Sequence, residues 1–64
     1  MNGWITLREL PKNELFKRKE NSNKVYTKEF FNRDIKKWEC NDYEDIGRYI
    51  LLKSDTKVFV NFTY

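Results

Sequence analysis

Residue types that can bind an anion gather between Lys24 and Asp42, where lysine and arginine side chains are interleaved with aromatic ones. Ammonium and guanidinium groups bind phosphate, and a nucleic-acid base stacked on an aromatic ring contributes about 1–3 kcal/mol. This segment therefore predicts a surface that binds a nucleotide or a short nucleic acid. The predicted ligand-binding residues are Tyr26, Lys28, Arg33, Lys36, Lys37 and Trp38.

Both residue types also have a purely structural interpretation. In a chain of 64 residues the core needs most of the aromatic side chains, and exposed cations keep the protein in solution. The charge is nevertheless uneven, since residues 1–37 hold ten Lys or Arg against five Asp or Glu, and residues 38–64 hold three against five. A basic half can mark an anion-binding face, so both interpretations stay open.

Groups suited to catalysis are scarce. The chain has no histidine to act as a general base, and its two glycines cannot form a glycine-rich phosphate loop. Ser22 and Ser54 lie in predicted turns without an activating partner. Cys40 is the only cysteine, and nothing near it in sequence would lower its pKa, so we interpret it as a small core residue. We expect a protein that is not an enzyme and that carries no cofactor.

An acidic run follows Cys40 and allows two interpretations. Asp42, Glu44 and Asp45 offer the oxygen ligands that calcium and magnesium prefer, but their spacing matches no established metal-binding loop. Asn41 or Asp42 can instead cap a single helical turn, with Ile46 packed inward and Gly47 leaving the turn in a left-handed conformation. We favour the cap and predict no metal site.

The same basic and aromatic segment predicts a β-hairpin. Residues 25–31 alternate with a period of two, Asn32 to Asp34 has turn chemistry, and residues 35–40 return. We expect Tyr26, Phe30 and Trp38 in one aromatic row across the pair. A register slip of one residue would exchange the two faces.

Three further strands are predicted at residues 14–19, 48–53 and 57–64. The second is apolar on both faces, as in a central strand or one at an oligomer contact. In the last, Val58, Val60, Phe62 and Tyr64 share a face. Phe59 lies on the polar face, either in a second small cluster or available to a partner.

Short-range signals also mark the opening of the chain. Thr6 and Glu9 have the spacing of a capping box, and Pro11 limits the helical segment to a single turn. Asn13 is a candidate for positive φ. In total we expect an all-β fold in one domain over residues 1–64. The expected form is a small five-stranded antiparallel barrel, SH3-like or OB-like, with one or two single helical turns.

Size and composition bear on assembly and location. Small chains need an extra source of stability, and with one cysteine and no histidine a homo-oligomer is the remaining candidate. The start of the chain lacks the pattern of a signal peptide, and no apolar run approaches the roughly 20 residues of a membrane span. We expect a cytoplasmic protein without a membrane partner.

Three stretches together carry a family resemblance: WITLRELPKNELFKRK, KVYTKEFFNRDIKKWECNDYEDI and DTKVFVNFTY. The chain resembles small uncharacterised β-rich proteins of bacteriophages and mobile genetic elements, which often have glycine where Asn13 stands. The resemblance implies a viral or mobile-element origin and, in that setting, the cytosol of the host. Those relatives have no established function, so it implies no activity.

Two functions follow as hypotheses. In the first, the protein binds an anionic nucleotide or short nucleic acid, for instance by sequestering a host signalling nucleotide. In the second, it inhibits or adapts a host protein through an exposed strand edge or the Phe59 face. Salt separates them, because phosphate binding weakens steeply with ionic strength and an apolar interface does not.

Overall fold

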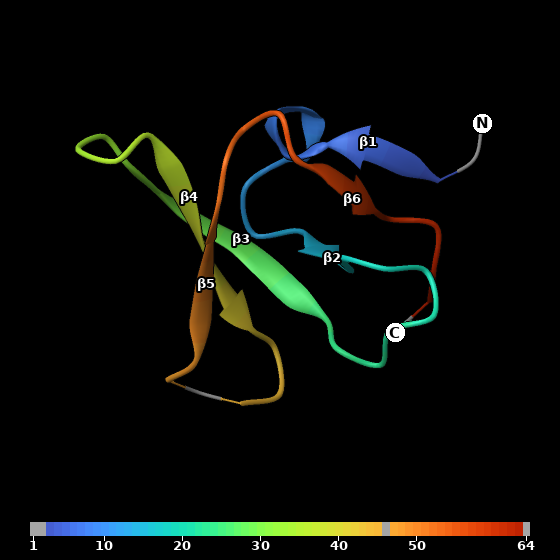
Figure 1. Ribbon diagram of the computed structural model, residues 1–64. Helices are drawn as coiled ribbons and strands as arrows, with labels where there is room; N and C mark the ends of the chain where they lie inside the picture. The colour runs from blue at the N-terminus through green and yellow to red at the C-terminus, as the bar shows by residue number, and fades with distance from the viewer. Residues whose placement is uncertain (1–2, 46, 64) are drawn as a thin grey trace.

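The computed structural model describes residues 3–45 and 47–63, where all regular structure except one 3-10 turn is β-strand (Figure 1). The elements are β1 (Trp4–Thr6), η1 (Leu7–Glu9), β2 (Leu15–Phe16), β3 (Tyr26–Asn32), β4 (Lys37–Asp42), β5 (Tyr49–Leu52) and β6 (Lys57–Phe59). An antiparallel sheet has the order β2-β3-β4-β5, and β1 pairs with β6 in a second sheet. The predicted all-β class is confirmed.

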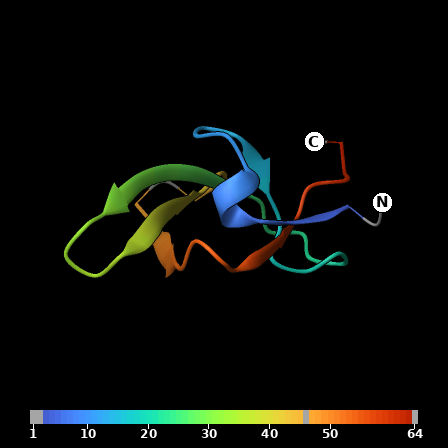
Figure 2. The same cartoon turned by 90° about the horizontal axis from the view of Figure 1, so that it is seen from above.

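A backbone contact joins the sheets without closing a barrel. Lys17 and Phe59 exchange backbone hydrogen bonds of 2.9 and 2.8 Å, which links the chain just after β2 to β6. The amide of Leu7 donates to the carbonyl of Thr56 at 2.8 Å, which holds η1 against the turn before β6. Figure 2 shows η1 between the β3–β4 hairpin and β1. Within the described ranges the sheets do not form a closed barrel, so that part of the prediction is not confirmed.

The strand count also differs from the prediction, because residues 4–6 form β1. Three residues are too short to show an alternating pattern, and the strand exists because Trp4, Ile5 and Thr6 pair with β6. At the other end, β6 stops at Phe59 instead of continuing to residue 64. The amide of Val60 donates to the carbonyl of Gly3 at 2.8 Å, and the chain leaves the sheet there. The predicted packing of Ile46 and Tyr64 lies outside the described residues.

Turn chemistry follows the sequence closely. The carboxylate of Glu9 accepts hydrogen bonds from the amide and the hydroxyl of Thr6 at 2.9 and 2.8 Å, so the predicted capping interaction forms around a single turn. Asn13 and Gly47 have φ of 73° and 96°, as expected from their residue types. Asp42 accepts hydrogen bonds from the next residues but caps a bend, because the described residues after it, 43–45, form no helical turn.

A β-bulge in the hairpin corrects the predicted aromatic row. Lys28 pairs with Cys40, but the next pair joins Phe30 to Glu39, so Glu29 is an extra residue on β3. Directly paired residues lie on the same face of a sheet. Phe30 therefore shares the outer face with Glu39 instead of facing the core with Tyr26.

Beyond the bulge, Phe31 takes the place in the row that the prediction gave to Phe30. It pairs with Trp38, which shares the inner face with Cys40 because the two are separated by one residue on β4. The rings of Phe31 and Trp38 have centroids 5.2 Å apart. The inner-face row consists of Tyr26, Lys28 and Phe31 on β3, opposite Asp42, Cys40 and Trp38 on β4.

The core lies between the inner face of the large sheet, η1 and β6. Its buried members are Leu7, Leu10, Phe16, Cys40, Leu52 and Val58, with Ile5, Tyr26, Trp38, Ile50 and Val60 packed around them. Phe59 is also buried, at 6% exposure, and packs between Trp4 and Phe62 with ring centroids 5.3 and 6.4 Å away. Of the two predicted alternatives for Phe59, the second aromatic cluster is the one that forms.

The β5 strand is buried on one face only, contrary to the prediction of two partly buried faces. Leu52 faces the core at 8% exposure, and Ile50 is partly buried beside it. Tyr49 and Leu51 point outward with 56% and 39% exposure. This one-sided burial follows from the position of β5 in the fold. It is the end strand of the large sheet, and nothing in the described chain covers its outer face.

Lys28 is buried at 3% exposure, although the sequence assigns it to the binding surface. Its ammonium donates hydrogen bonds to the carbonyl oxygens of Leu7, at 2.8 Å, and Leu10. The same nitrogen lies 4.0 Å from the centre of the Trp38 ring. Burial lowers the pKa of Lys28. This side chain joins β3 to the segment around η1.

Replacing Lys28 with methionine should destabilise the protein by about 1–3 kcal/mol, because the change withdraws the donor from two carbonyl groups in the core. The measurement is the free energy of unfolding in urea. Lys12→Met is the matched control, since Lys12 is exposed over the Phe30 ring, and its effect should stay within about 0.5 kcal/mol. Equal effects of the two substitutions would contradict the structural role of Lys28.

Candidate anion-binding groove

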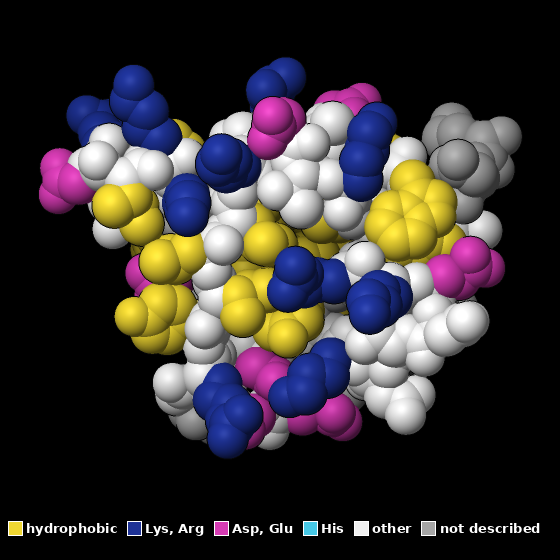
Figure 3. Space-filling model, viewed as in Figure 1, with side chains coloured by type: hydrophobic (Ala, Val, Ile, Leu, Met, Phe, Trp, Pro, Cys, Tyr) yellow, Lys and Arg dark blue, Asp and Glu magenta, His cyan; other side chains and the backbone are white. Residues whose placement is uncertain are grey.

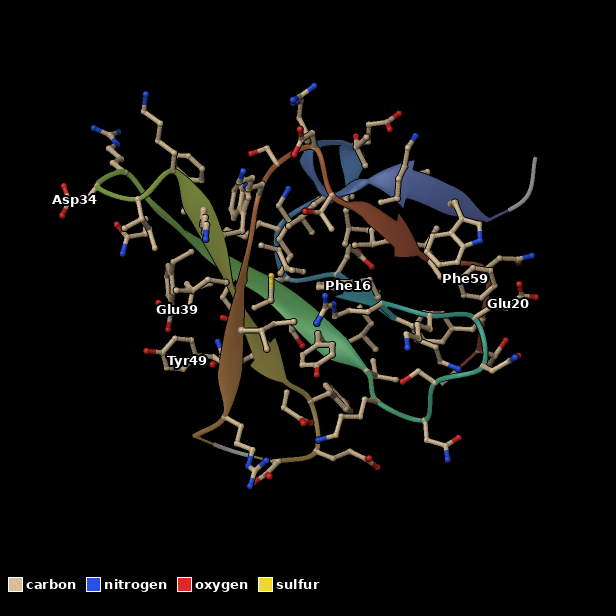
Figure 4. All side chains as sticks on the ribbon, in the orientation of Figure 1. Phe16, Glu20, Asp34, Glu39, Tyr49 and Phe59 are labelled. Atoms are coloured by element: carbon tan, nitrogen blue, oxygen red, sulfur yellow. The ribbon has the colours of Figure 1, made fainter. Side chains whose placement is uncertain are left out.

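A groove of about 590 Å³, here called the tip groove, lies beside the end of the β3–β4 hairpin. Its lining comes from three segments that are far apart in sequence: η1, the hairpin turn with its flanking residue, and the turn after β5. The lining residues are Arg8, Phe31, Arg33, Ile35, Lys36, Lys53, Ser54 and Asp55. In Figure 4, Asp34 marks the end of the hairpin next to this groove.

The tip groove is strongly basic. Four cations, Arg8, Arg33, Lys36 and Lys53, surround a single carboxylate, that of Asp55. All four cations are exposed, and none forms a salt bridge with another residue that the structure describes. Their charges are therefore available to an anion from solution. Figure 3 shows basic side chains gathered over the hairpin turn and around an apolar centre.

An aromatic ring forms one wall of the groove. Phe31 is 41% exposed, and its inner side rests on Trp38. Ile35 adds apolar surface at 45% exposure. A ring that is packed on one side and open on the other gives a fixed platform for a flat ligand. The platform and the cations thus meet in one place.

Local hydrogen bonds hold the walls of the groove. In the hairpin turn, the Asn32 side chain accepts a hydrogen bond from the amide of Asp34 at 3.0 Å, and Lys36 has a φ of 55°. On the opposite wall, the amide of Arg8 donates to the carbonyl of Ser54 at 2.9 Å. The Ser54 hydroxyl accepts a hydrogen bond from Nε1 of Trp38 at 3.1 Å. Ser54 thereby ties η1 and β4 to the turn after β5.

The structure brings only two of the six predicted site residues together in the tip groove. Arg33 and Lys36 line the tip groove. Trp38 lies behind Phe31, half-buried, and Lys28 lies in the core. Two others are elsewhere on the hairpin: Lys37 pairs with Asn32 at the start of β4, and Tyr26 lies at the opposite end of β3.

The sequence prediction missed two of the four cations that line the tip groove. Arg8 lies within the correctly predicted capping box, and Lys53 closes the predicted strand at residues 48–53, but nothing local relates them to Arg33. The fold brings them together through the hydrogen bond between Arg8 and Ser54. Their places in or next to predicted turns, which usually lie at the surface, are the one signal that the sequence offers.

The surroundings of Cys40 and of Asp42 give both side chains a structural role. Cys40 is fully buried, and burial raises the pKa of its thiol to about 11, so it stays protonated at neutral pH. The carboxylate of Asp42 accepts hydrogen bonds from Lys24 and from the amides of Glu44 and Asp45, and the carboxylate of Asp45 forms a salt bridge with Arg48. In residues 3–45 and 47–63, no group of three or more His, Cys, Asp or Glu is placed to hold a metal ion.

Comparison with protein-family models, curated proteins and solved structures gives no significant match for this chain. In the part of the chain that the structure describes, no helix has the length and apolarity needed to cross a membrane.

Asp42 should make stability sensitive to acid. Its pKa is lowered by the hydrogen bond from the Lys24 ammonium and by the amides of Glu44 and Asp45. A carboxyl group with a depressed pKa stabilises the fold above its unfolded value of 3.8, and this contribution is lost as the pH falls through the folded value. The free-energy difference between wild type and Asp42→Asn should therefore shrink from pH 7 to pH 3. Asp34→Asn, in the exposed hairpin turn, should keep the acid sensitivity of the wild type.

Cys40 should resist thiol reagents in the folded protein. Its burial and raised pKa predict labelling at pH 8 at least about a hundredfold slower than in urea. A variant with Asn23→Cys in the exposed loop before β3 serves as the control, since one of its two thiols should react at once. Rapid labelling of Cys40 in the native wild type would contradict this assignment.

Proposed function

We propose that this chain is a non-enzymatic binding protein of the phage or mobile-element type, which captures an anionic nucleotide or a short nucleic acid in the tip groove. One observation carries the proposal. Arg8, Arg33, Lys36 and Lys53 converge from separate parts of the chain around the exposed ring of Phe31, and none has a described salt-bridge partner. Like charges that lie close together repel one another, and the single carboxylate of the groove, that of Asp55, balances only one of the four positive charges, so a bound anion is favourable.

The two kinds of side chain suit the two parts of a nucleotide. Guanidinium groups at Arg8 and Arg33 can each donate two hydrogen bonds to phosphate oxygens, and the ammonium groups add charge. The face of Phe31 can stack on the base. The volume of about 590 Å³ also lies within the range of about 300–1,000 Å³ that is common for small-molecule sites.

Asp55 gives the groove a hydrogen-bond acceptor among the donors. A carboxylate repels phosphate but accepts hydrogen bonds from the amino or ring N–H groups of a base or from a ribose hydroxyl. The mixture favours a ligand with a separate anionic end and a polar flat end. This distinguishes a nucleotide from a simple polyanion such as inorganic phosphate or sulfate.

A second function is supported by the outer face of the large sheet. Phe30 is 57% exposed and lies on the same face as Tyr49 and Leu51 of the end strand β5. Figure 4 shows Glu39 and Tyr49 pointing to the same side, away from Phe16 in the core. Exposed apolar side chains beside a free strand edge suit a protein partner, such as a host protein or a second copy of this chain. This is the alternative proposal.

The primary test is a native mass spectrum with a pool of mono-, di- and cyclic nucleotides and a short RNA. We expect stoichiometric adducts at low salt, whose dissociation constants are then measured by titration. Arg33→Glu with Lys53→Glu should weaken binding about a hundredfold at low salt, because each reversal turns an attraction into a repulsion.

The control is Lys12→Glu, which changes the charge by the same amount per residue but lies outside the tip groove. It should weaken binding by less than about threefold. No adduct at low salt, or an affinity that Arg33→Glu and Lys53→Glu leave unchanged, would refute the anion-binding proposal. A protein partner that still binds the wild type in high salt, but does not bind the Tyr49→Ser variant, would support the alternative proposal.

A further inference from the structure

The β5 strand has one paired side and one free side. It is the last strand in the order β2-β3-β4-β5 and pairs with β4 alone among the described strands (Figure 1). Edge strands are usually protected against further pairing by a lysine, a proline or a bulge within the strand. The sequence of β5 is YILL, and its register with β4 is regular, so none of these protections is present. Its free side is open to another strand.

The ladder between β4 and β5 shows which backbone groups lie on the free side. The amide of Asp42 donates to the carbonyl of Arg48 at 2.9 Å, so these opposite residues form a hydrogen-bonded pair. Opposite pairs in an antiparallel ladder alternate between bonded and non-bonded, which makes Tyr49 and Leu51 non-bonded toward β4. Their amides and carbonyls therefore point away from β4. Within residues 3–45 and 47–63, these groups form no backbone hydrogen bond outside the sheet.

This row of donors and acceptors is complementary to a second copy of itself. If two β5 strands run antiparallel about a twofold axis at Ile50, Tyr49 of each copy lies opposite the partner's Leu51. Each such pair exchanges two hydrogen bonds, so the amide and carbonyl of both residues are used. A shift of two residues in either direction would pair Tyr49 or Leu51 with a residue beyond β5. The centred register is the one that lies wholly within the two strands.

The side chains of β5 suit the same arrangement. Tyr49 and Leu51 are 56% and 39% exposed on the outer face, and each would pack against the other type on the partner. Figure 4 shows Tyr49 directed away from Phe16 in the core. Ile50 lies on the opposite face, half-buried, and would meet the partner's Ile50. Apolar pairs directly opposite one another stabilise a sheet. Pairing therefore removes apolar surface from water on both faces of β5.

The charges that flank β5 favour antiparallel copies. Lys53 follows the strand, whereas Glu44 and Asp45 lie in the loop that precedes it. Asp45 is bound to Arg48 at 2.9 Å, but Glu44 and Lys53 are exposed and form no salt bridge within the described residues. Antiparallel pairing brings Lys53 of each copy toward the acidic loop of the other. Opposite charges then approach at both ends of the contact.

We propose that β5 pairs with β5 of a second copy, in the register that sets Tyr49 opposite the partner's Leu51. The two large sheets then form one continuous sheet across a twofold axis. The inference commits the outer-surface alternative to one partner and rests on that surface, not on nucleotide binding. Dimerisation also supplies a source of stability beyond the small core of each chain.

The test is sedimentation equilibrium over protein concentrations from about 5 to about 500 µM. We expect a monomer–dimer equilibrium with a dissociation constant of about 100 µM or tighter, because a contact along one short strand belongs to the weaker class of specific interfaces. A monomer mass at every concentration would overturn the inference.

Paired charge substitutions test the register. Tyr49→Lys with Leu51→Lys sets like charges opposite one another in both pairs and should weaken the dimer at least about tenfold. Tyr49→Glu with Leu51→Lys sets opposite charges across both pairs and should dimerise at least about tenfold more tightly than the double-lysine variant. Tyr49→Lys with Leu51→Glu should do the same. Equal dissociation constants for the like-charge and opposite-charge variants would overturn the proposed register.

The matched control is Asn21→Lys with Asn23→Lys, in the exposed loop before β3. It adds as much charge as the double-lysine variant but away from β5, so its dissociation constant should stay within about threefold of the wild type. A loss as large as that of the double-lysine variant would mean that net charge, and not strand pairing, decides association. Equal urea unfolding midpoints at low protein concentration confirm that the variants keep the fold.

The outcome is distinguishable from that of the anion-binding proposal. Nucleotide titrations are carried out at protein concentrations below the dissociation constant of the dimer, where one copy supplies the whole tip groove. A dimer that binds no nucleotide would refute the anion-binding function alone. A monomer that binds nucleotide would refute the strand pairing alone.

Discussion

The buried ammonium of Lys28 is the interaction on which the arrangement depends. A charge in the interior is costly unless hydrogen bonds replace its water, and here the carbonyls of Leu7 and Leu10 and the face of Trp38 surround it. The two carbonyls belong to η1 and the residue that ends it, whereas Lys28 and Trp38 belong to the central hairpin. One side chain thus fixes the opening of the chain against the sheet.

That attachment positions the candidate site. Arg8 follows Leu7 in η1, so η1 must be in place before the Arg8 guanidinium can face the hairpin turn. Two hydrogen bonds also fix the turn after β5. The Arg8 amide donates to the Ser54 carbonyl, and the Trp38 indole donates to the Ser54 hydroxyl. The cations of the tip groove are therefore positioned by segments that the buried Lys28 holds together, and a ligand cannot reach the Lys28 ammonium itself. The sequence pattern assigned Lys28 to the binding surface, but in the structure Lys28 supports that surface from the core.

The bulge at Glu29 divides the exposed aromatic residues between two surfaces. Without the extra residue, Phe30 would continue the inner row and Phe31 would face outward. With it, Phe31 joins the basic inner side, and Phe30 lies on the outer face with Tyr49 and Leu51. One surface then combines charge with rings, and the other is more apolar. The two proposed functions correspond to these two surfaces, and they differ in salt dependence for this reason.

The sequence by itself determined what depends on neighbours within a few residues. The all-β class, the capping interaction between Thr6 and Glu9, the hairpin, and the left-handed conformations of Asn13 and Gly47 all follow from side-chain periodicity and local hydrogen bonding. Only the tertiary structure decided the bulge, because a strand's alternation is the same with or without an extra residue until its partner fixes the register. Burial of Lys28 and the meeting of Arg8, Arg33 and Lys53 were decided there too. Each depends on segments that are distant in sequence, whose relative placement is set by packing and cross-strand pairing.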